Sequence, residues 1–433
     1  QQSAQELLPL VQQAKLLAKQ YDAVIANPPY MGNGYLNPLL KEFLKKNYIG
    51  YEKDLFSTFM IRNLHFAKPN GQLGFMSPMV WMFITSYEKL RSHFIDNATI
   101  TSLIQLEYSG FDGATVPICT FTLAKSHIKD FTVSYIRLSD FKGSDNQAPK
   151  TLEAIQNPRC GWFFNSKPDD FKKIPGSPIA YWVSKQIIKS FSNNESLVSF
   201  CPVKEGTTTG DTNRFLKLWQ EINADNIGFG CESTLKSIQS TKKWFPYIKG
   251  GEFRKWYGNH EYVVNWYNDG EEIKGYSGST PRGSKFYFKE NLNWSKVSSS
   301  TFSCRYSPKG FCFDTGGLAL FPQADLIKPL IGLMNSKVVN IVLGALSPTL
   351  NYTVGNISSL PIPKNLDTYQ SDISDSCIQI AQNDWDSYET SWDFTQNPII
   401  RTGQTNLEQA FHTWQQQNAD AVAEMKRLEE ENN

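Results

Sequence analysis

The stretch YDAVIANPPYMGNGY, residues 21–35, carries the clearest structural signal in the chain. It begins with a short apolar run, residues 22–26, of the kind that forms a strand buried in a parallel sheet. The run stops abruptly at the sequence Asn-Pro-Pro-Tyr, residues 27–30. Because an open α/β sheet presents its ligand site at the carboxyl ends of its strands, these four residues are the first candidates for a functional site.

The surrounding residues alternate between strand and helix signals. Helical spacing of apolar residues is found over 4–19, over 54–68 and in a segment that ends near residue 96. Further apolar strands are predicted at 72–76, 99–107 and 117–125. This alternation up to about residue 125 predicts an α/β fold with an open sheet.

The pattern changes after about residue 140. Short alternating strands follow, with predicted positions at 262–266, 286–288, 302–306 and 311–313. Hairpin turns are predicted at residues 268–270 and 307–310. One helical stretch, residues 323–345, interrupts the strands, and an acidic segment rich in Gln and Asn begins at residue 364. We expect this acidic segment to end in a helix.

Composition limits the class of protein. The net charge of +1 does not indicate a polyanionic partner, so any basic surface must be local. Seven cysteines without a C-x-x-C spacing predict reduced thiols and a cytoplasmic location. The five histidines form no cluster with cysteines, so no metal site is expected. The most apolar stretch, residues 331–346, is interrupted by polar residues and is predicted to be a core helix and not a membrane span.

The Asn-Pro-Pro-Tyr sequence suits one reaction, the methylation of an exocyclic amino group. Such a nitrogen is a poor nucleophile until two acceptors take its hydrogens and turn its lone pair toward the methyl group. The Asn27 side-chain oxygen is one acceptor, and the carbonyl of Pro28, held still by Pro29, is the second. Tyr30 offers a face on which an extruded base can stack. The alternative is an ordinary strand followed by a proline turn.

Basic and aromatic residues are interleaved between residues 236 and 260, a pattern that suits phosphate contact and stacking. The predicted DNA contacts in this segment are Lys242, Lys243, Lys249, Arg254, Lys255 and Trp256. Arg214, Arg282 and Arg305 are further candidate readers of bases or phosphates. The competing interpretation is a hairpin with a solvated charged face and a buried aromatic face. The segment 205–215 is a second candidate contact loop, and a helix N-terminus capped by Asp211 or Thr212 is an equally good interpretation of it.

Several motifs in order resemble the N6-adenine DNA methyltransferases. VIANPPY resembles motif IV of that class, DLFSTFM (54–60) motif V, KPNGQLGFMSP (68–78) motif VI, and GFDGATVPICTFTLAK (110–125) motif VIII. The resemblance implies that Phe111 stacks against the second face of the flipped base, opposite Tyr30. It also implies that Asp54 and Phe56 lie near the cleft that binds S-adenosyl-L-methionine. For these two residues, a helix N-cap and a core aromatic are the alternative roles.

A narrower resemblance joins NPPYMG, WMFITSYEKLR (81–91), KWFPYIKGGEFRKWYGN (243–259) and SPTLNYTVGNISSLPI (347–362). Together these are similar to the PglX family, the methyltransferases of BREX bacteriophage-defence systems. The resemblance implies a site-specific, base-flipping adenine-N6 methyltransferase with double-stranded DNA and other defence proteins of the same operon as partners. The implied organisation is the C-terminal half of a Rossmann-like class I methyltransferase sheet (1–140), a connector (141–180), a mixed α+β target-recognition domain (181–363) and a helical C-terminal segment (364–433).

The family's Gly-rich cofactor loop precedes Asn-Pro-Pro-Tyr, yet the 26 residues before Asn27 contain no glycine. We therefore expect the chain to be an internal piece of a longer protein and to be inactive alone. Two alternatives stay open at this point. One is a methyltransferase that acts on RNA or on protein glutamine, and the other is a non-catalytic DNA-recognition subunit.

Overall fold

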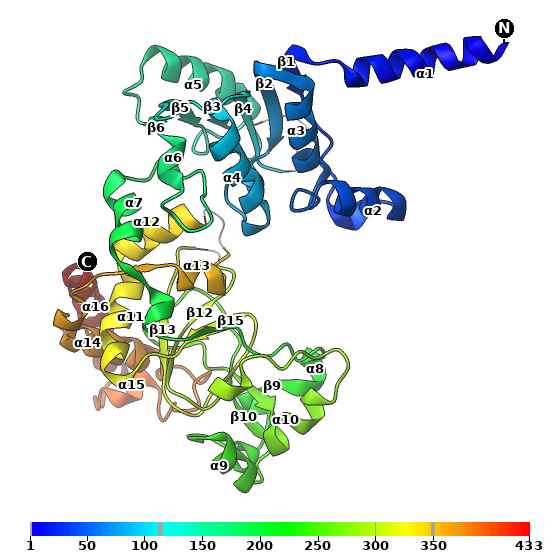
Figure 1. Cartoon of the computed structure of the whole chain (residues 1–433). Coiled ribbons are helices and arrows are strands. Elements are labelled where there is room, and N and C mark those ends of the chain that lie inside the picture. The colour runs from blue at the N-terminus through cyan, green and yellow to red at the C-terminus, as the bar shows by residue number, and fades with distance from the viewer. Residues whose placement is uncertain (1, 111–115, 299, 348–350, 370) are drawn as a thin grey trace. The chain divides into compact units, whose positions relative to one another are not determined.

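The computed structural model describes residues 2–110, 116–298, 300–347, 351–369 and 371–433, without the side chains of residues 2–6 and 367 (Figure 1). The chain forms two compact units, Gln1–Ser192 and Asn193–Asn433, here called unit 1 and unit 2. The predicted connector 141–180 lies within unit 1, and the acidic segment from residue 364 lies within unit 2.

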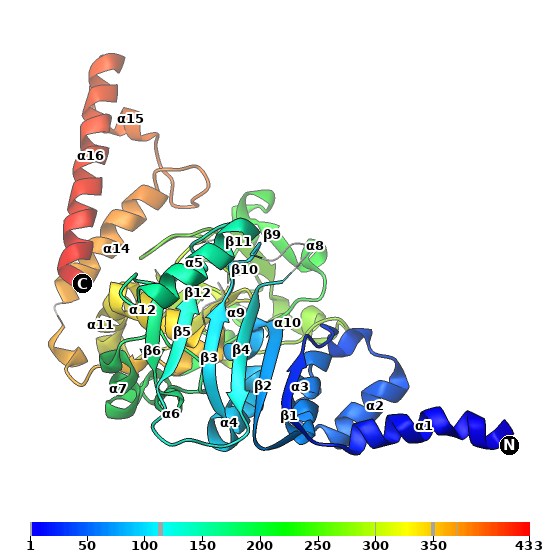
Figure 2. The ribbon, with the colours of Figure 1, turned by 90° about the horizontal axis from the view of Figure 1, so that it is seen from above.

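Unit 1 is built on a six-stranded sheet with the order β1-β2-β4-β3-β5-β6 (Figure 2). Its strands are β1 (Tyr21–Ala26), β2 (Ala67–Pro78), β3 (Thr99–Gln105), β4 (Ile118–Ala124), β5 (Val133–Arg137) and β6 (Phe163–Ser166). The β1–β2 and β3–β5 pairs are parallel, whereas β4 runs antiparallel to both β2 and β3. The four strands predicted from the sequence are β1 to β4, so the predicted open α/β sheet is confirmed.

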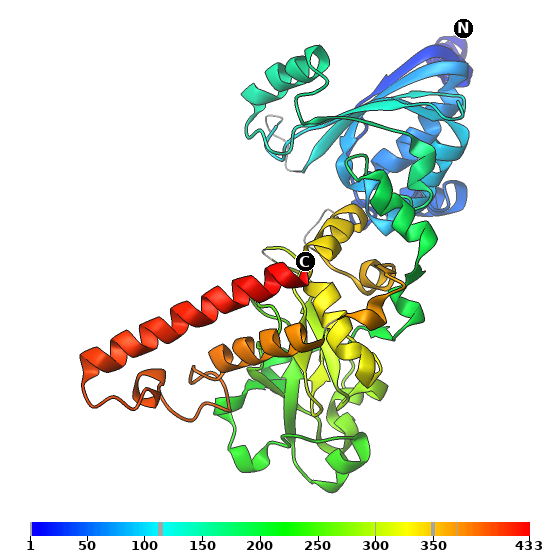
Figure 3. The ribbon, with the colours of Figure 1, turned by 90° about the vertical axis from the view of Figure 1, so that its left-hand side faces the viewer.

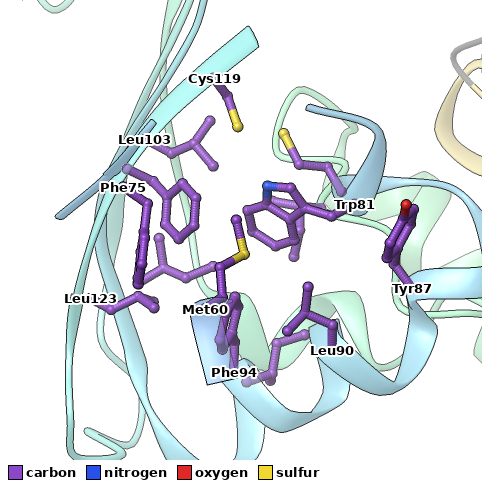
Figure 4. Close-up of a cluster of buried hydrophobic side chains, with 14 of the residues drawn as sticks. Met60, Phe75, Trp81, Tyr87, Leu90, Phe94, Leu103, Cys119 and Leu123 are labelled. Atoms are coloured by element: carbon purple, nitrogen blue, oxygen red, sulfur yellow. The ribbon is translucent and has the colours of Figure 1, made fainter. Parts of the chain in front are cut away.

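The helices that begin in unit 1 are α1 (Gln2–Ala18), α2 (Pro38–Asn47), α3 (Leu55–Phe66), α4 (Glu88–Asn97), α5 (Ser144–Gln156), α6 (Pro168–Phe171) and α7 (Lys185–Asn193). Helices α3 and α4 bury apolar residues against the sheet, whereas the described side chains of α1 are exposed. Figure 4 shows the main core, where Met60 of α3 and Phe94 of α4 meet Phe75, Leu103 and Leu123 of the sheet. This core fixes α3, and with it the loop that precedes the helix, against the strands.

Unit 2 contains two four-stranded sheets, with the orders β14-β10-β11-β9 and β13-β12-β15-β8, and a short β16-β7 pair. Its strands are β7 (Glu195–Ser196), β8 (Val203–Lys204), β9 (Leu216–Leu218), β10 (Trp244–Ile248), β11 (Tyr262–Asn265), β12 (Asn291–Ser295), β13 (Arg305–Ser307), β14 (Cys312–Phe313), β15 (Gly317–Leu320) and β16 (Pro361–Ile362). Aromatic residues of the β14-β10-β11-β9 sheet share one core with Ala319 of β15, with Phe321 after β15 and with Phe288.

The helices of unit 2 are α8 (Thr212–Phe215), α9 (Thr234–Gln239), α10 (Tyr267–Lys274), α11 (Ile327–Asn335), α12 (Lys337–Leu346), α13 (Val354–Ser358), α14 (Ser371–Trp385), α15 (Pro398–Arg401) and α16 (Leu407–Asn432). The helical stretch predicted at 323–345 is two helices, because Ser336 is extended and its hydroxyl caps α12. The predicted final helix is α16, which lies beside α14 (Figure 3).

Among the described residues, no single helix is both long enough and apolar enough to cross a membrane. In the part of the chain that the structure describes, one pair of helices, Ala324–Asn335 and Lys337–Leu346, bent by 71°, meets the length and composition test when the two are taken together.

Candidate active site and DNA interface

The Asn-Pro-Pro-Tyr sequence follows the last residue of β1, at the edge of the sheet where the parallel strand β2 also ends. Ala26 is in register with Phe75, so the end of β2 at Pro78 lies on the same side of the sheet. Pro28 is buried, whereas Asn27, Pro29 and Tyr30 are exposed. The predicted position at a carboxyl edge is therefore the one that the structure shows, and the side chain of Asn27 is open to a ligand.

Tyr30 orients the Asn27 side chain. The Tyr30 hydroxyl donates a hydrogen bond to the Asn27 Oδ1 atom over 2.9 Å. Burial, and then the nearby Cys119 thiol, raise the pKa of Tyr30, so the phenol keeps its proton at neutral pH and stays a donor. In this arrangement Oδ1 is the carboxamide atom that faces Tyr30. Since a carbonyl oxygen has two lone pairs, Oδ1 can accept a second hydrogen from a ligand.

Asp54 ties the loop after the motif to the start of α3. Its Oδ1 atom accepts hydrogen bonds from the backbone N–H groups of Met31, over 2.9 Å, and of Phe56, over 3.2 Å. The Leu55 N–H donates back to the Met31 carbonyl over 3.0 Å. Burial raises the pKa of the Asp54 carboxyl, against the backbone N–H groups that favour its ionised form.

The two residues predicted near the cofactor cleft have structural roles here. Asp54 is the N-cap of α3 and holds the loop described above. Phe56 is 1% exposed and packs against Tyr87, with the ring centroids 5.3 Å apart. Phe56 is therefore a core ring, and one oxygen of the Asp54 carboxylate is used by the backbone. A role for either residue beside the cofactor stays a prediction. Phe111, the predicted second stacking residue, lies outside the described residues.

Three residues of unit 2 that were predicted to bind DNA bind the C-terminal helices instead. Arg254 forms an ion pair with Asp384 of α14. The Lys255 Nζ atom lies 3.1 Å from the Glu429 carboxylate of α16. That carboxylate also accepts a hydrogen bond from Trp256 Nε1 over 2.9 Å, and Trp256 is 1% exposed. The prediction that Trp256 stacks on DNA is therefore not supported, because the indole is buried within unit 2.

Arg305 is also buried, which corrects its predicted role as a surface reader. Its Nη1 atom donates to the Arg254 carbonyl and its Nη2 atom to Ser295 Oγ, each over 3.3 Å. Burial lowers the pKa of Arg305 to about 10, so it still carries its charge at neutral pH. The hydrogen bonds show that Arg305 supports the chain around Arg254 from inside unit 2.

The remaining predicted contacts lie wholly or partly at the surface. Arg214 pairs with Glu272, and Arg282 pairs with Glu205 over 3.0 Å. Lys242 donates to the Asp225 carbonyl, whereas Lys243 is exposed beside Trp244. Lys249 is half-buried above the ring of Tyr262. The structure therefore does not gather the predicted contacts on one free surface.

The sequence did not reveal the partners that compensate these cations. Residues 364–433 contain thirteen Asp or Glu and four Lys or Arg, so an acidic segment was visible. Which basic residues Asp384 and Glu429 would contact was not visible, because the partners are 130 and 174 positions apart in sequence.

Comparison with known proteins agrees with the motifs. The family model for the Eco57I restriction-modification methylase matches residues 4–111. The adenine-specific methyltransferase BrxX of Escherichia coli O9:H4 (strain HS) is 38% identical over 408 residues, which cover 92% of this chain and 32% of that protein. The adenine-specific methyltransferase PglX of Lacticaseibacillus casei (strain Zhang) is 36% identical over 445 residues, which cover 99% of this chain and 37% of that protein. The predicted resemblance to PglX is confirmed, and the chain spans about a third of the length of these curated relatives.

Among solved structures, the Type IIL restriction-modification enzyme MmeI, determined in complex with DNA, matches 94% of this chain and 53% of its own with a TM-score of 0.57. The two sequences are 11% identical, so this likeness concerns the fold alone. It confirms the predicted fold class, an open α/β sheet followed by a mixed α+β region.

Proposed function

We propose that this chain supplies the target-base pocket and the DNA-recognition part of an S-adenosyl-L-methionine-dependent, site-specific DNA adenine-N6 methyltransferase in a bacteriophage-defence system. The two relatives that match more than 90% of this chain, BrxX and PglX, carry the name adenine-specific methyltransferase. Double-stranded DNA and other defence proteins of the same operon are the proposed partners. Seven free cysteines among the described residues support a reducing, cytoplasmic setting.

The observation that carries the proposal is the exposed Asn27 carboxamide at the carboxyl end of β1, oriented by Tyr30. In the proposed reaction, Asn27 Oδ1 accepts one N6 hydrogen of adenine and the Pro28 carbonyl accepts the other. The nitrogen lone pair is then turned toward the incoming methyl group. Preorganised acceptors of this kind stabilise the charge that develops on nitrogen, without a strong general base.

The methyl donor is a further part of the proposal. S-adenosyl-L-methionine, when bound, would supply an electrophilic methyl group beside Asn27. Asp54 Oδ1 accepts two backbone N–H groups and Phe56 is 1% exposed, so we assign no donor contact to either residue.

The base must leave the duplex before it can reach Asn27. Extrusion of a base costs a few kcal/mol of stacking and pairing, which stacking in the pocket partly offsets. The ring of Tyr30, 38% exposed beside Asn27, is the proposed stacking surface. Phe111 is proposed as the second one.

Methyl transfer by the purified protein, encoded by the gene in its full natural length, tests this function. Asn27→Ala should lower the rate of adenine methylation by about 100-fold or more, the usual cost of losing one preorganised partner. DNA binding should stay within about two-fold, since one neutral side chain is lost. Asn47→Ala, at the exposed end of α2, is the matched control and should methylate normally. Full activity of Asn27→Ala would refute the assignment of Asn27. If the protein methylated RNA or protein but not DNA, the proposed substrate would be wrong.

A further inference from the structure

We propose that a basic cluster around Phe286, and not the segment 249–260, makes the main phosphate contacts of unit 2 with DNA. The Phe286 cluster consists of Lys204, Arg282, Lys285, Phe286, Lys289 and Lys296. The inference rests on the proposed function, because it names the surface through which that function holds its substrate.

Two loops are fastened together to form the base of this cluster. The backbone groups of Thr208 and Thr280 exchange two hydrogen bonds, over 3.0 and 2.8 Å. The Thr207 hydroxyl donates to the Arg282 carbonyl over 3.2 Å. Gly283 has φ +68°, and a Cβ atom there would lie 2.7 Å from the Glu205 carbonyl. The loop that carries Arg282 is therefore packed directly on the loop that follows β8.

The aromatic ring of Phe286 brings cations together. The Nζ atom of Lys204 lies 5.3 Å from the centroid of the ring, and that of Lys289 lies 5.2 Å from it. Phe286 is itself fixed by Phe321, with the centroids 4.9 Å apart. Contacts between cations and an aromatic face stabilise such a gathering of like charges. Because the ring is half-buried and covered in this way, we assign it to holding lysines and not to stacking on bases.

The cluster carries an excess of positive charge. Glu205 is shared by Lys296, at 2.8 Å, and Arg282, at 3.0 Å. Glu290, next to Lys289 in sequence, bonds to the Tyr306 hydroxyl instead. In the described part of the chain, Lys204, Lys285 and Lys289 have no carboxylate partner, and Lys285 and Lys289 are exposed. Five cations with one shared acid fit a polyanion, and DNA releases counterions when lysines contact its phosphates.

The segment 249–260, the alternative phosphate-binding surface, is less accessible to a phosphate. Arg254 and Lys255 are paired with Asp384 and Glu429, so a phosphate that bound them would have to displace carboxylates of α14 and α16. No such displacement is needed at Lys285 and Lys289. For this reason the Phe286 cluster, which composition alone did not single out, is the better candidate for phosphate contact.

Salt-dependent DNA binding by the full-length protein tests the inference. Lys285→Ala/Lys289→Ala should weaken binding to a duplex and flatten the slope of log K against log salt by about 1.8, the value for two lost phosphate contacts. Lys285→Arg/Lys289→Arg should keep the wild-type slope. Lys236→Ala/Lys337→Ala is the charge-matched control, because these exposed lysines pair with Glu232 and Glu430 within unit 2. This control should leave the slope unchanged.

The outcomes separate the inference from the proposed function. If the wild type binds and methylates DNA but the Lys285→Ala/Lys289→Ala protein keeps its slope, the cluster is not the phosphate contact. A flattened slope for Lys255→Ala in the same assay would return that role to the segment 249–260. If the wild type neither binds nor methylates DNA, the proposed function itself fails, and the inference falls with it.

Discussion

Asn27 and Tyr30 form the smallest unit on which the proposed chemistry depends. The Tyr30 hydroxyl donates a hydrogen bond of 2.9 Å to Asn27 Oδ1, the carboxamide atom that faces Tyr30 in this structure. If the amide were reversed, its NH2 group would repel the amino group of adenine. We therefore propose two separable roles for Tyr30: its hydroxyl orients Asn27, and its ring is the surface on which the base stacks.

Tyr30→Phe should separate these two roles. The substitution removes the hydrogen bond and keeps the ring, so we expect methylation to slow by roughly five-fold, in line with one hydrogen bond of about 1 kcal/mol. Tyr30→Ala removes both roles and should slow it much further. The rate of single-turnover methylation is the measurement, and Tyr35→Phe, 87% exposed, is the control. Equal losses for Tyr30→Phe and Tyr30→Ala would contradict a separate stacking role.

His260 gives unit 2 a predicted dependence on pH. Its ring is buried, its Nε2 atom lies 2.8 Å from Ser307 Oγ, and burial, with the charge of Arg305, lowers its pKa to about 3. Tyr257, Phe311 and Trp392 surround the ring. The folded state thus keeps His260 neutral, whereas the unfolded chain takes up a proton below pH 6.5. Stability from this group is complete above pH 6.5 and falls as the pH drops toward 3.

At pH 5 the loss from His260 should be about 2 kcal/mol in the free energy of unfolding. Denaturant unfolding of unit 2 at pH 7.5 and pH 5 measures it. His260→Gln, which cannot take up the proton, should be less stable at pH 7.5 but lose less between the two pH values. A wild type and variant with the same pH dependence would show that His260 is not the group responsible.

At the scale of elements, the C-terminal helices and the segment 249–260 depend on each other. Glu429 of α16 accepts hydrogen bonds from Lys255 and Trp256. The guanidinium carbon of Arg254 lies 5.2 Å from the ring centroid of Trp385 of α14. An acidic segment and a basic, aromatic segment thus compensate each other inside unit 2. The interleaved pattern that predicted DNA contact describes an internal interface equally well.

Glu429 allows this interface to be tested. Glu429→Ala leaves Trp256 Nε1 and the Lys255 charge without their partner, and should cost about 2 kcal/mol, as for a hydrogen bond to a charged group. Glu429→Gln keeps an acceptor for Trp256 and should cost less. Hydrogen exchange in α16 and in residues 249–260 should quicken together in the alanine variant. Faster exchange in only one of the two segments would contradict their mutual dependence.

Two elements show where sequence patterns fail. Residues 268–270 were predicted to form a hairpin turn, and they do have positive φ angles of 46°, 58° and 71°. They form a kink between β11 and the helical residues 271–274, however, and no strand in the described part of the chain pairs back across them. Phe286 and Phe288 were predicted to share a strand, but Phe286 ends a 3-10 turn and Phe288 has φ +66°. The turn at residues 268–270 was predicted correctly. The strands were not, because strand pairing depends on partners that are distant in sequence.

At the scale of the molecule, the sequence predicted unit 1 better than unit 2. Unit 1 has long apolar strands and helices whose order determines the sheet, and Asn27 to Tyr30 were placed from the end of one strand. Unit 2 consists of short strands held by long-range contacts. Arg305 and Trp256 are buried in unit 2. The sequence did not predict this, because burial of an arginine or a tryptophan depends on partners that are distant in sequence.

The central claim is that Asn27 presents adenine N6 for methylation. A methylome tests it most directly: the gene in its full natural length, with its operon neighbours, is expressed in a bacterium without DNA methylation, beside its Asn27→Ala twin. Long-read sequencing then maps N6-methyladenine in both strains. We predict one sequence motif methylated in the wild type and unmethylated in the variant. The same methylated motif in both strains would contradict the claim, because the modification would not depend on Asn27.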